Sequence, residues 1–356
     1  MSTKISFTVT AAYNDKQMKI FLRQFCGVSA SLLTSLKRTQ DGITLNGSHA
    51  RSVDIVHAGD TVVLSLSQDE SDIPPSDLPC CVIYEDEHVI AYDKPPFMTV
   101  HPVRGHLGDT LANAAAGYAQ SKGERYAFRA VNRLDRDTSG VVLAAKNSFA
   151  AALLPKSAHK TYVGVCEGII TKPGTVRAPI RLKSGHTIER ETGEGGAPAV
   201  THYVPIAQFG ERTLLEFTLE TGRTHQIRVH MSSIGHPLAG DDMYGSAQSK
   251  TENICAENST ADTTDPPSGA CFTKNYAAAR MTQSELETAW NEYFLRKAVY
   301  IEDILNGRCT EAATRSDRFI RQALHCAKVE FIHPITKEKV TVRSSLPPEF
   351  SAAGRR

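Results

Sequence analysis

Residues 129–145 read Arg-Ala-Val-Asn-Arg-Leu-Asp-Arg-Asp-Thr-Ser-Gly-Val-Val-Leu-Ala-Ala, and this stretch says more than any other about fold and chemistry. It places Asp135 between Arg133 and Arg136, in a short charged turn that precedes an apolar run. Neighbouring cations favour the ionised form of a carboxylate, and an anionic carboxylate beside guanidinium groups suits chemistry on a substrate that carries phosphate. The residues from Asp137 to Gly140 are also turn formers, so an ordinary turn with weak surface ion pairs is the alternative.

The segment Asn132-Arg-Leu-Asp-Arg-Asp-Thr-Ser-Gly140 resembles the signature loop of the RluA family of RNA pseudouridine synthases, in which His is more usual at the position of Asn132. Four further segments resemble the other signatures of that family and follow in the same order: residues 83–96 with His101-Pro102, residues 160–162 with Glu167-Gly168, residues 220–245, and residues 321–325 with 331–334. One such motif alone would be weak evidence. Five in register over residues 80–347 are specific for the family.

Strand-like runs dominate the chain between residues 80 and 245. They lie at residues 81–91, 140–145, 161–166, 199–206 and 213–219. Shorter helical patterns lie at residues 110–119 and 224–234. The strands outnumber the helices and do not alternate with them regularly, which favours an α+β fold with a mixed, mostly antiparallel sheet. The resemblance implies the same fold, a pseudouridine synthase catalytic domain over residues 80–347.

Residues 1–67 predict a small separate α/β module. An alternating apolar run begins at Ile5, Ser29 is expected to cap a helix, and Asn46-Gly47 predicts a turn after a short strand. This order resembles the S4-type RNA-binding module. Seven Lys or Arg residues against four Asp residues suit contact with phosphate, although a solvated helix face is the alternative. The candidates for RNA contact in this module are Lys19, Arg23, Lys37 and Arg38.

Two segments lie outside the pattern of the family. Residues 68–79 are acidic and carry prolines, so they predict an interdomain linker. Residues 246–319 interrupt the catalytic domain with a polar first half and a helical second half that begins at the capping box Thr282-x-x-Glu285. This insertion holds eight basic and eleven acidic residues. The net negative charge of this insertion argues against RNA binding and favours a helix packed on the body, with a partner-binding helix as the alternative.

Composition narrows the class of protein. The 356 residues carry a formal net charge of +1, so an RNA site must come from local clusters of charge. The eight cysteines form no CxxC pair and no ligand spacing, which predicts reduced thiols and no metal site. The N-terminus has no apolar segment typical of a signal peptide, and no run is long enough to span a bilayer. We therefore expect a cytoplasmic monomer that contacts no membrane.

The resemblance assigns roles to individual residues. It implies that Asp135 is the catalytic carboxylate, that Arg223 pairs with it, and that Tyr162 stacks on the target base and helps to deprotonate it. Ile227 and Leu324 match apolar positions that line the site. The expected substrate contacts are completed by Arg133, which would fill the space left by a flipped base, and by the backbone-binding candidates Arg136, Arg104 and Arg228.

The expected activity is the isomerisation of uridine to pseudouridine in a structured RNA, with ribosomal RNA favoured over tRNA by the S4-like module. The reaction involves no redox change and no group donor, so neither a nucleotide cofactor nor a metal is expected. The carboxylate either attacks the sugar or abstracts a proton to give a glycal, and the sequence leaves both open. A non-catalytic RNA-binding protein that retains the scaffold is the alternative. A glycoside hydrolase would need a second carboxylate, for which Asp137 lies too near in the chain.

Overall fold

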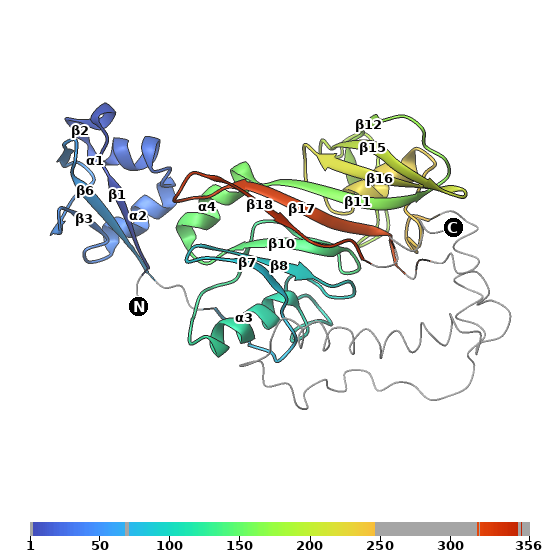
Figure 1. Cartoon of the computed structure of the whole chain (residues 1–356), viewed down its shortest axis with the longest axis horizontal. Helices are drawn as coiled ribbons and strands as arrows, with labels where there is room; N and C mark the ends of the chain where they lie inside the picture. The colour runs from blue at the N-terminus through green and yellow to red at the C-terminus, as the bar shows by residue number, and fades with distance from the viewer. Residues whose placement is uncertain (1–2, 68–70, 246–318, 320, 348–349, 351–356) are drawn as a thin grey trace.

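The computed structural model describes residues 3–67, 71–245, 319, 321–347 and 350. Figure 1 shows a small N-terminal module beside a larger body built on one long sheet. Each part has a hydrophobic core of its own. In the described residues, no helix is both long and apolar enough to cross a bilayer.

The N-terminal module is a four-stranded sheet covered by helices. The sheet order is β1 (Thr3–Thr8), β6 (Thr61–Leu66), β3 (Ile43–Leu45) and β4 (Ser48–His49). The other elements are η1 (Ala11–Tyr13), β2 (Lys16–Gln17) paired with β5 (Ile55–Val56), α1 (Met18–Ile20), which continues into a π-helix, η2 (Phe21–Phe25), and α2 (Ala30–Arg38). The expected cap is confirmed, because Ser29 Oγ accepts from Leu32 N at 3.1 Å. The expected turn is confirmed by the positive φ of Asn46 and Gly47.

The body is organised by a ten-stranded sheet. Its main path is β12 (Gly174–Arg177), β15 (Val200–Phe209), β16 (Arg212–Leu219), β11 (His159–Glu167), β17 (Leu324–Ile332), β10 (Ser139–Ala145), β8 (Val89–Lys94) and β7 (Val82–Glu85). Two more strands join it, β18 (Lys339–Arg343) on β17 and β9 (Arg129–Ala130) on β10. The pairing of β10 with β17 is parallel, and the other pairings are antiparallel. The expectation of a mixed, mostly antiparallel sheet is confirmed.

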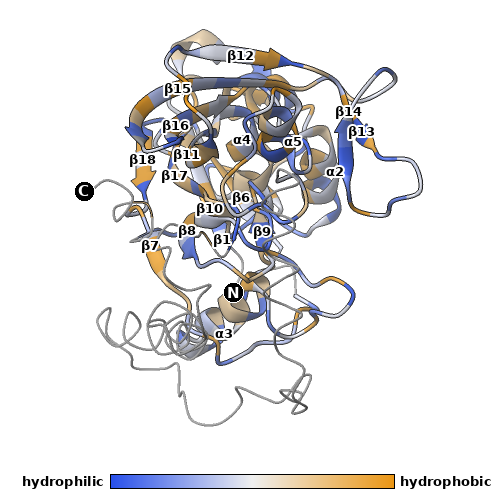
Figure 2. Cartoon of the chain, turned by 90° about the vertical axis from the view of Figure 1, so that its right-hand side faces the viewer, coloured by the Kyte–Doolittle hydropathy of each residue, from blue (hydrophilic) through white to orange (hydrophobic). Residues whose placement is uncertain are grey.

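Two helices of the body begin at polar side-chain caps. The side chain of Thr110 accepts from Asn113 N and starts α3 (Leu111–Ser121), as the sequence predicts. Asn147 caps α4 (Ser148–Ser157), a helix that the sequence pattern does not reveal because residues 149–154 are all apolar and Pro155 follows them. The predicted helix at 224–234 is α5 (Gln226–Ser233). A separate hairpin of β13 (Ile180–Leu182) and β14 (Arg190–Thr192) projects from the body (Figure 2).

The run at residues 81–91, predicted as one strand, is a hairpin of β7 and β8, and the prediction of a single strand is wrong. Asp86 turns the chain, because its Oδ1 accepts from the backbone N–H groups of His88 and Val89 at 2.7 and 2.8 Å. The residues on both sides of this turn are apolar because they pack on the same core. In the sequence they therefore form one nearly continuous apolar run, which is typical of a single strand.

The N-terminal module is docked on the body. Phe149 of α4 is buried in the core of the module, and its ring lies 5.8 Å from that of Phe7. Leu153 and Ile335 of the body pack against the same cluster. This shared apolar contact opposes free reorientation of the two parts.

The second half of the segment expected to be a linker also lies against the body. Ser76 N donates to Asn113 O at 3.1 Å, and Asn113 Nδ2 donates to Pro74 O at 2.8 Å. Ile73 and Leu78 pack on the core of the body. These residues are therefore fixed on α3 rather than extended in solvent. The predicted insertion at 246–319 lies outside the described residues apart from Phe319.

Candidate active site

Asp135 lies in the loop that joins β9 to β10, next to the centre of the sheet. Asn132 joins the start of this loop to β10, because its side chain donates to Val141 O at 2.9 Å and accepts from Leu143 N at 2.8 Å. Inside the loop, Thr138 N donates to Asp135 O at 3.1 Å. The side chain of Asp135 is 26% exposed, so a substrate can reach the carboxylate.

A buried lysine holds the backbone of this loop through hydrogen bonds. Lys94, at the end of β8, is fully buried, and its Nζ donates to the carbonyls of Pro95, Met98 and Arg136 at 2.8, 2.8 and 3.0 Å. Arg136 O also accepts from Met98 N at 3.1 Å. Burial, followed by the charge of Arg321, lowers the pKa of Lys94 to about 7. This amino group therefore fixes the backbone directly after Asp135.

The segment before β17 holds the other end of the loop. Arg321 Nη1 donates to Asp137 O at 3.0 Å, and its Nη2 donates to Ser139 Oγ at 3.1 Å. Gln322 Nε2 donates to Thr138 Oγ1 at 3.2 Å. These bonds join two segments that are about half the chain apart in sequence. They explain why the closing signature belongs to the active site although it supplies no carboxylate.

Gly140 permits the parallel pairing of β10 with β17. Its φ is +108°, which side-chain-bearing residues rarely adopt. A Cβ at this position would lie 2.3 Å from Cys326 O and 2.7 Å from Cys326 N. The glycine therefore lets the strand that follows Asp135 approach β17 closely.

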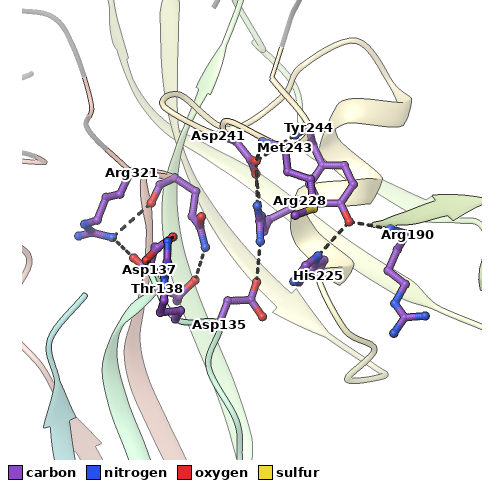
Figure 3. A network of polar contacts seen from close by, with 12 residues as sticks. Asp135, Asp137, Thr138, Arg190, His225, Arg228, Asp241, Met243, Tyr244 and Arg321 are labelled. Atoms are coloured by element: carbon purple, nitrogen blue, oxygen red, sulfur yellow. Dashed lines mark hydrogen bonds and ion pairs between the residues drawn. The ribbon is translucent and has the colours of Figure 1, made fainter. Parts of the chain in front are cut away.

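The guanidinium of Arg228, on α5, joins two carboxylates. Nε and Nη2 donate to the Oδ2 and Oδ1 atoms of Asp241 at 2.7 and 2.9 Å, and Nη1 lies 3.4 Å from Asp135 Oδ2 (Figure 3). Burial opposes the charge on Arg228, but the hydrogen bonds and charge of Asp241, with the charge of Asp135, raise its pKa above the usual value. Tyr244 adds a ring whose centroid lies 5.0 Å from Arg228 Cζ.

The expected pairing of Asp135 with Arg223 is wrong. Arg223 is exposed, it precedes α5, and its Nε donates to Pro198 O at 3.0 Å. The structure gives the ion pair to Arg228 instead. The expectation that Arg228 contacts the RNA backbone is also wrong, because its side chain is only 6% exposed and is occupied by two carboxylates.

Three of the predicted residues belong to the hydrophobic core of the body, and one of them, Tyr162, is near enough to Asp135 to feel its charge. Tyr162 on β11, Leu324 on β17 and Ile227 on α5 are all buried in one cluster. Burial first, and then the neighbouring Cys326 and the charge of Asp135, raise the pKa of Tyr162 well above its usual value. The neutral phenol is therefore the form present at neutral pH, which disfavours the expected role of Tyr162 as a base.

The other arginines predicted to contact RNA are exposed, but one of them is already paired with a carboxylate. Arg133 is exposed, and its charge adds to burial in lowering the pKa of His101. Arg136 is exposed but forms a bidentate pair with Asp137, at 2.7 and 3.1 Å. Arg104 is exposed in the loop after the Lys-Pro turn. These three side chains lie on the surface, whereas Arg228 lies beneath it.

The predicted basic residues of the module lie on α1, η2 and α2 and are all exposed. Lys37 and Arg38 occupy the last turn of α2, and Lys19 lies on α1. Arg23 Nη1 donates to Val28 O at 3.1 Å, which ties this side chain to its own module. Arg38 also lines a hollow of about 510 Å³ on the outer face of α2, together with small polar residues.

Sequence reasoning missed the residues that position the carboxylate. Lys94, Asp241, Tyr244 and Arg321 all lie inside segments that resemble family signatures. Their partners are far away in the chain, so the motifs mark them without telling what they do. A separate cavity of about 860 Å³, lined by residues such as Lys122 and Lys146, contains none of the predicted site residues.

Comparison with known proteins found a matching family model and several similar proteins. The family model described as RNA pseudouridylate synthase matches residues 88–233. A protein of Xanthomonas campestris pv. campestris named ribosomal large subunit pseudouridine synthase D is 30% identical over 345 residues, which is 92% of this chain and 87% of the relative. The protein named uncharacterized RNA pseudouridine synthase YjbO of Bacillus subtilis is 38% identical over 228 residues, which is 62% of this chain and 80% of the relative.

A solved structure was also found. The structure of human RNA pseudouridylate synthase domain containing 1 gives a TM-score of 0.47 at 20% identity, with 79% of this chain and 89% of that chain covered.

Proposed function

The chain belongs to the RluA-type family of RNA pseudouridine synthases, which are isomerases, and we propose that it converts a uridine of structured ribosomal RNA to pseudouridine. In this proposal Asp135 is the catalytic carboxylate. The observation that carries it is the ion pair of Asp135 with the buried Arg228 at 3.4 Å. One side of the carboxylate is open to a substrate, and the other side is held by a cation that cannot leave.

The reaction needs such a carboxylate. It breaks the bond between the uracil ring nitrogen and C1′ of the ribose, turns the base, and rejoins base and sugar through carbon. Aspartate carboxyls are anionic at neutral pH, and an anion beside C1′ can attack the sugar or abstract a proton to give a glycal. Both routes use the same placement of Asp135. Neither requires a nucleotide cofactor or a metal.

Tyr162, Leu324 and Ile227 form the proposed floor of the nucleotide site. A phenol offers a flat face to a base together with a polar tip. Because its pKa is raised by burial, we assign Tyr162 to stacking and not to proton removal. The two aliphatic side chains belong to the same hydrophobic cluster as that ring.

The target uridine must leave its stack before Asp135 can reach C1′. Arg133 is exposed two residues before the carboxylate, and a planar guanidinium can stack in the vacated space and still meet phosphate. Arg104 and Arg136 are the further candidates for backbone contacts. Arg228 is removed from this group because its guanidinium is already bound to Asp241 and Asp135.

Two features favour ribosomal RNA over tRNA. Relatives such as that of Xanthomonas campestris are named as ribosomal large subunit enzymes, and the N-terminal module, which we propose to be S4-like, exposes Lys19, Arg23, Lys37 and Arg38. A cytoplasmic location follows from such a substrate. The alternative of a non-catalytic RNA-binding protein gives no reason for an accessible carboxylate braced by a buried arginine.

The test is pseudouridine mapping of cellular RNA from strains with and without the gene. The proposal expects one or more ribosomal positions to lose pseudouridine in the deletion strain and to regain it when the gene is restored. A loss confined to tRNA would overturn the choice of RNA. An unchanged map would overturn the activity itself.

A further inference from the structure

His225 is held in an unusual conformation beside Asp135. It directly precedes α5 with φ +57° and ψ +21°, the left-handed region that residues other than glycine adopt rarely. Its side chain makes no capping bond to the helix, so capping does not explain the conformation. Residues other than glycine adopt this conformation at turns, as Asn46 does in this chain, and also at functional sites. At His225 a turn bond from Gln226 N to Arg223 O, at 3.1 Å, holds the backbone.

Tyr244 fixes the tautomer of the His225 ring. The hydroxyl of Tyr244 accepts from Arg190 N at 2.8 Å and lies 2.9 Å from His225 Nδ1. A phenol has a single hydrogen, and in the described part of the chain Nδ1 is the acceptor recorded for it. Tyr244 therefore donates to Nδ1, and the imidazole proton is on Nε2.

The ring is neutral and lies near the carboxylate. Burial lowers the pKa of His225, and the charged groups that surround it partly offset one another. These groups are Asp135, Arg228, Asp241 and Arg190. Figure 3 shows the ring between Asp135 and Arg190, below the Tyr244 hydroxyl. Within the described residues, no hydrogen-bond partner of Nε2 is recorded.

We propose that His225 donates a hydrogen bond from Nε2 to the uracil carbonyl oxygen next to the ring nitrogen that leaves the sugar. This inference rests on the proposed function. With Asp135 at C1′, that carbonyl is the base oxygen nearest to the carboxylate. When the bond to C1′ breaks, the electron pair stays on the uracil ring and negative charge grows on this oxygen. A preorganised neutral donor stabilises such charge more in the transition state than in the bound substrate.

The diagnostic variant is His225→Asn. Asparagine tolerates the left-handed conformation, and its side chain can still reach Tyr244, but it has no donor where Nε2 lies. We expect kcat for pseudouridine formation on transcribed large-subunit ribosomal RNA to fall about 100- to 1,000-fold. The dissociation constant for RNA and the melting temperature should match those of the wild type. His202→Asn, on β15 and bound to Thr175 and Glu220, is the matched control and should keep full activity.

A substituted RNA identifies the acceptor. Replacing the target uridine by 2-thiouridine exchanges the carbonyl oxygen for sulfur, a weak acceptor. The substitution should slow the wild type strongly and slow the His225→Asn variant little, because that variant has already lost the bond. An equal cost in both proteins would overturn the inference.

Two other results would also overturn it. One is a kcat of His225→Asn within threefold of the wild type. The other is a fall in activity that merely follows a fall in melting temperature or RNA affinity, since a structural role would explain it. If the wild type forms no pseudouridine in any RNA, the proposed function fails, and the role of His225 fails with it.

Discussion

The guanidinium of Arg228 lies 3.4 Å from the carboxylate of Asp135, although 93 residues separate the two in the chain. The same guanidinium binds the buried Asp241 through two further nitrogens. It cannot turn away without leaving a buried carboxylate unpaired, which is costly. The side chain of Asp135 is thus held from one side only, and its exposed side is left for the substrate.

Replacing Asp135 by Asn should abolish pseudouridine formation. The amide keeps the size of the side chain but has no charge to act at C1′. We expect kcat to fall by at least about a thousandfold, with RNA affinity within twofold of the wild type, as measured by tritium release from labelled RNA and by filter binding. Asp137→Asn is the control and should keep most of its activity, because the Asp137 carboxylate is paired with Arg136. Substantial turnover by Asp135→Asn would refute the assigned role.

Replacing Arg228 by Lys should cost both stability and activity. A single ammonium cannot bind both oxygens of Asp241 and still reach Asp135. We expect a loss of about 1.5–3 kcal/mol in the free energy of unfolding, measured by urea denaturation, together with a lower kcat. Arg223→Lys is the matched control in the same signature and should stay within about 0.5 kcal/mol, because Arg223 is exposed. A larger cost for Arg223→Lys than for Arg228→Lys would contradict the pairing.

The pairing of Asp135 shows where sequence reasoning reached its limit. Arg223 and Arg228 lie in one signature, and nothing local distinguishes their roles. The two arginines differ because α5 begins at Gln226. Arg223 therefore lies in the exposed segment before the helix, whereas Arg228 lies on the buried side of the helix. Contacts of this kind depend on how distant segments are packed, and no local pattern contains that information.

Local chemistry, by contrast, was predictable. Ser29 caps a helix as predicted, and the helical pattern predicted at residues 110–119 forms a helix whose cap is Thr110. The mixed sheet followed from strand-rich patterning without a regular alternation with helices. The hairpin at 81–91 is not evident in the sequence, because both arms are apolar and no glycine, proline or asparagine marks the turn at Asp86. The docking of Phe149 on the module could not be predicted, since a buried aromatic residue does not reveal which core it joins.

The stability contributed by Lys94 should depend on pH. Burial lowers the pKa of Lys94 to about 7 in the folded protein, whereas an unfolded lysine titrates near 10.4. Between these values the unfolded chain binds the additional proton, so raising the pH favours the folded state. Lys94→Met lacks this effect and is less stable throughout, because the carbonyls of Pro95, Met98 and Arg136 lose an amine that donates three hydrogens when charged and two when neutral.

Urea unfolding at pH 7, 8 and 9 measures this dependence. Over this range, the free energy of unfolding of the wild type should exceed that of Lys94→Met by an amount that grows by up to about 1.4 kcal/mol per pH unit. A constant difference between the two proteins would mean that the buried amine keeps its proton, and the prediction would then be wrong.

Replacing Lys37 and Arg38 by Gln should flatten the salt dependence of RNA binding. The two residues are exposed in the last turn of α2. Point changes are more informative here than removal of residues 1–67, which would uncover the buried Phe149. Each lost phosphate contact lowers the slope of log affinity against log salt by about 0.7 to 0.9, so the double variant should lose up to about 1.8.

Lys172→Gln with Arg343→Gln is the matched control for this change in charge. Both residues are exposed on the body, so their replacement removes the same net charge away from the module. The control should retain nearly all of the slope because long-range attraction between exposed charges is screened in salt. Equal slopes for the two double variants would show that RNA affinity depends only on the total charge of the protein. The proposal that the module is an RNA-binding surface would then be wrong.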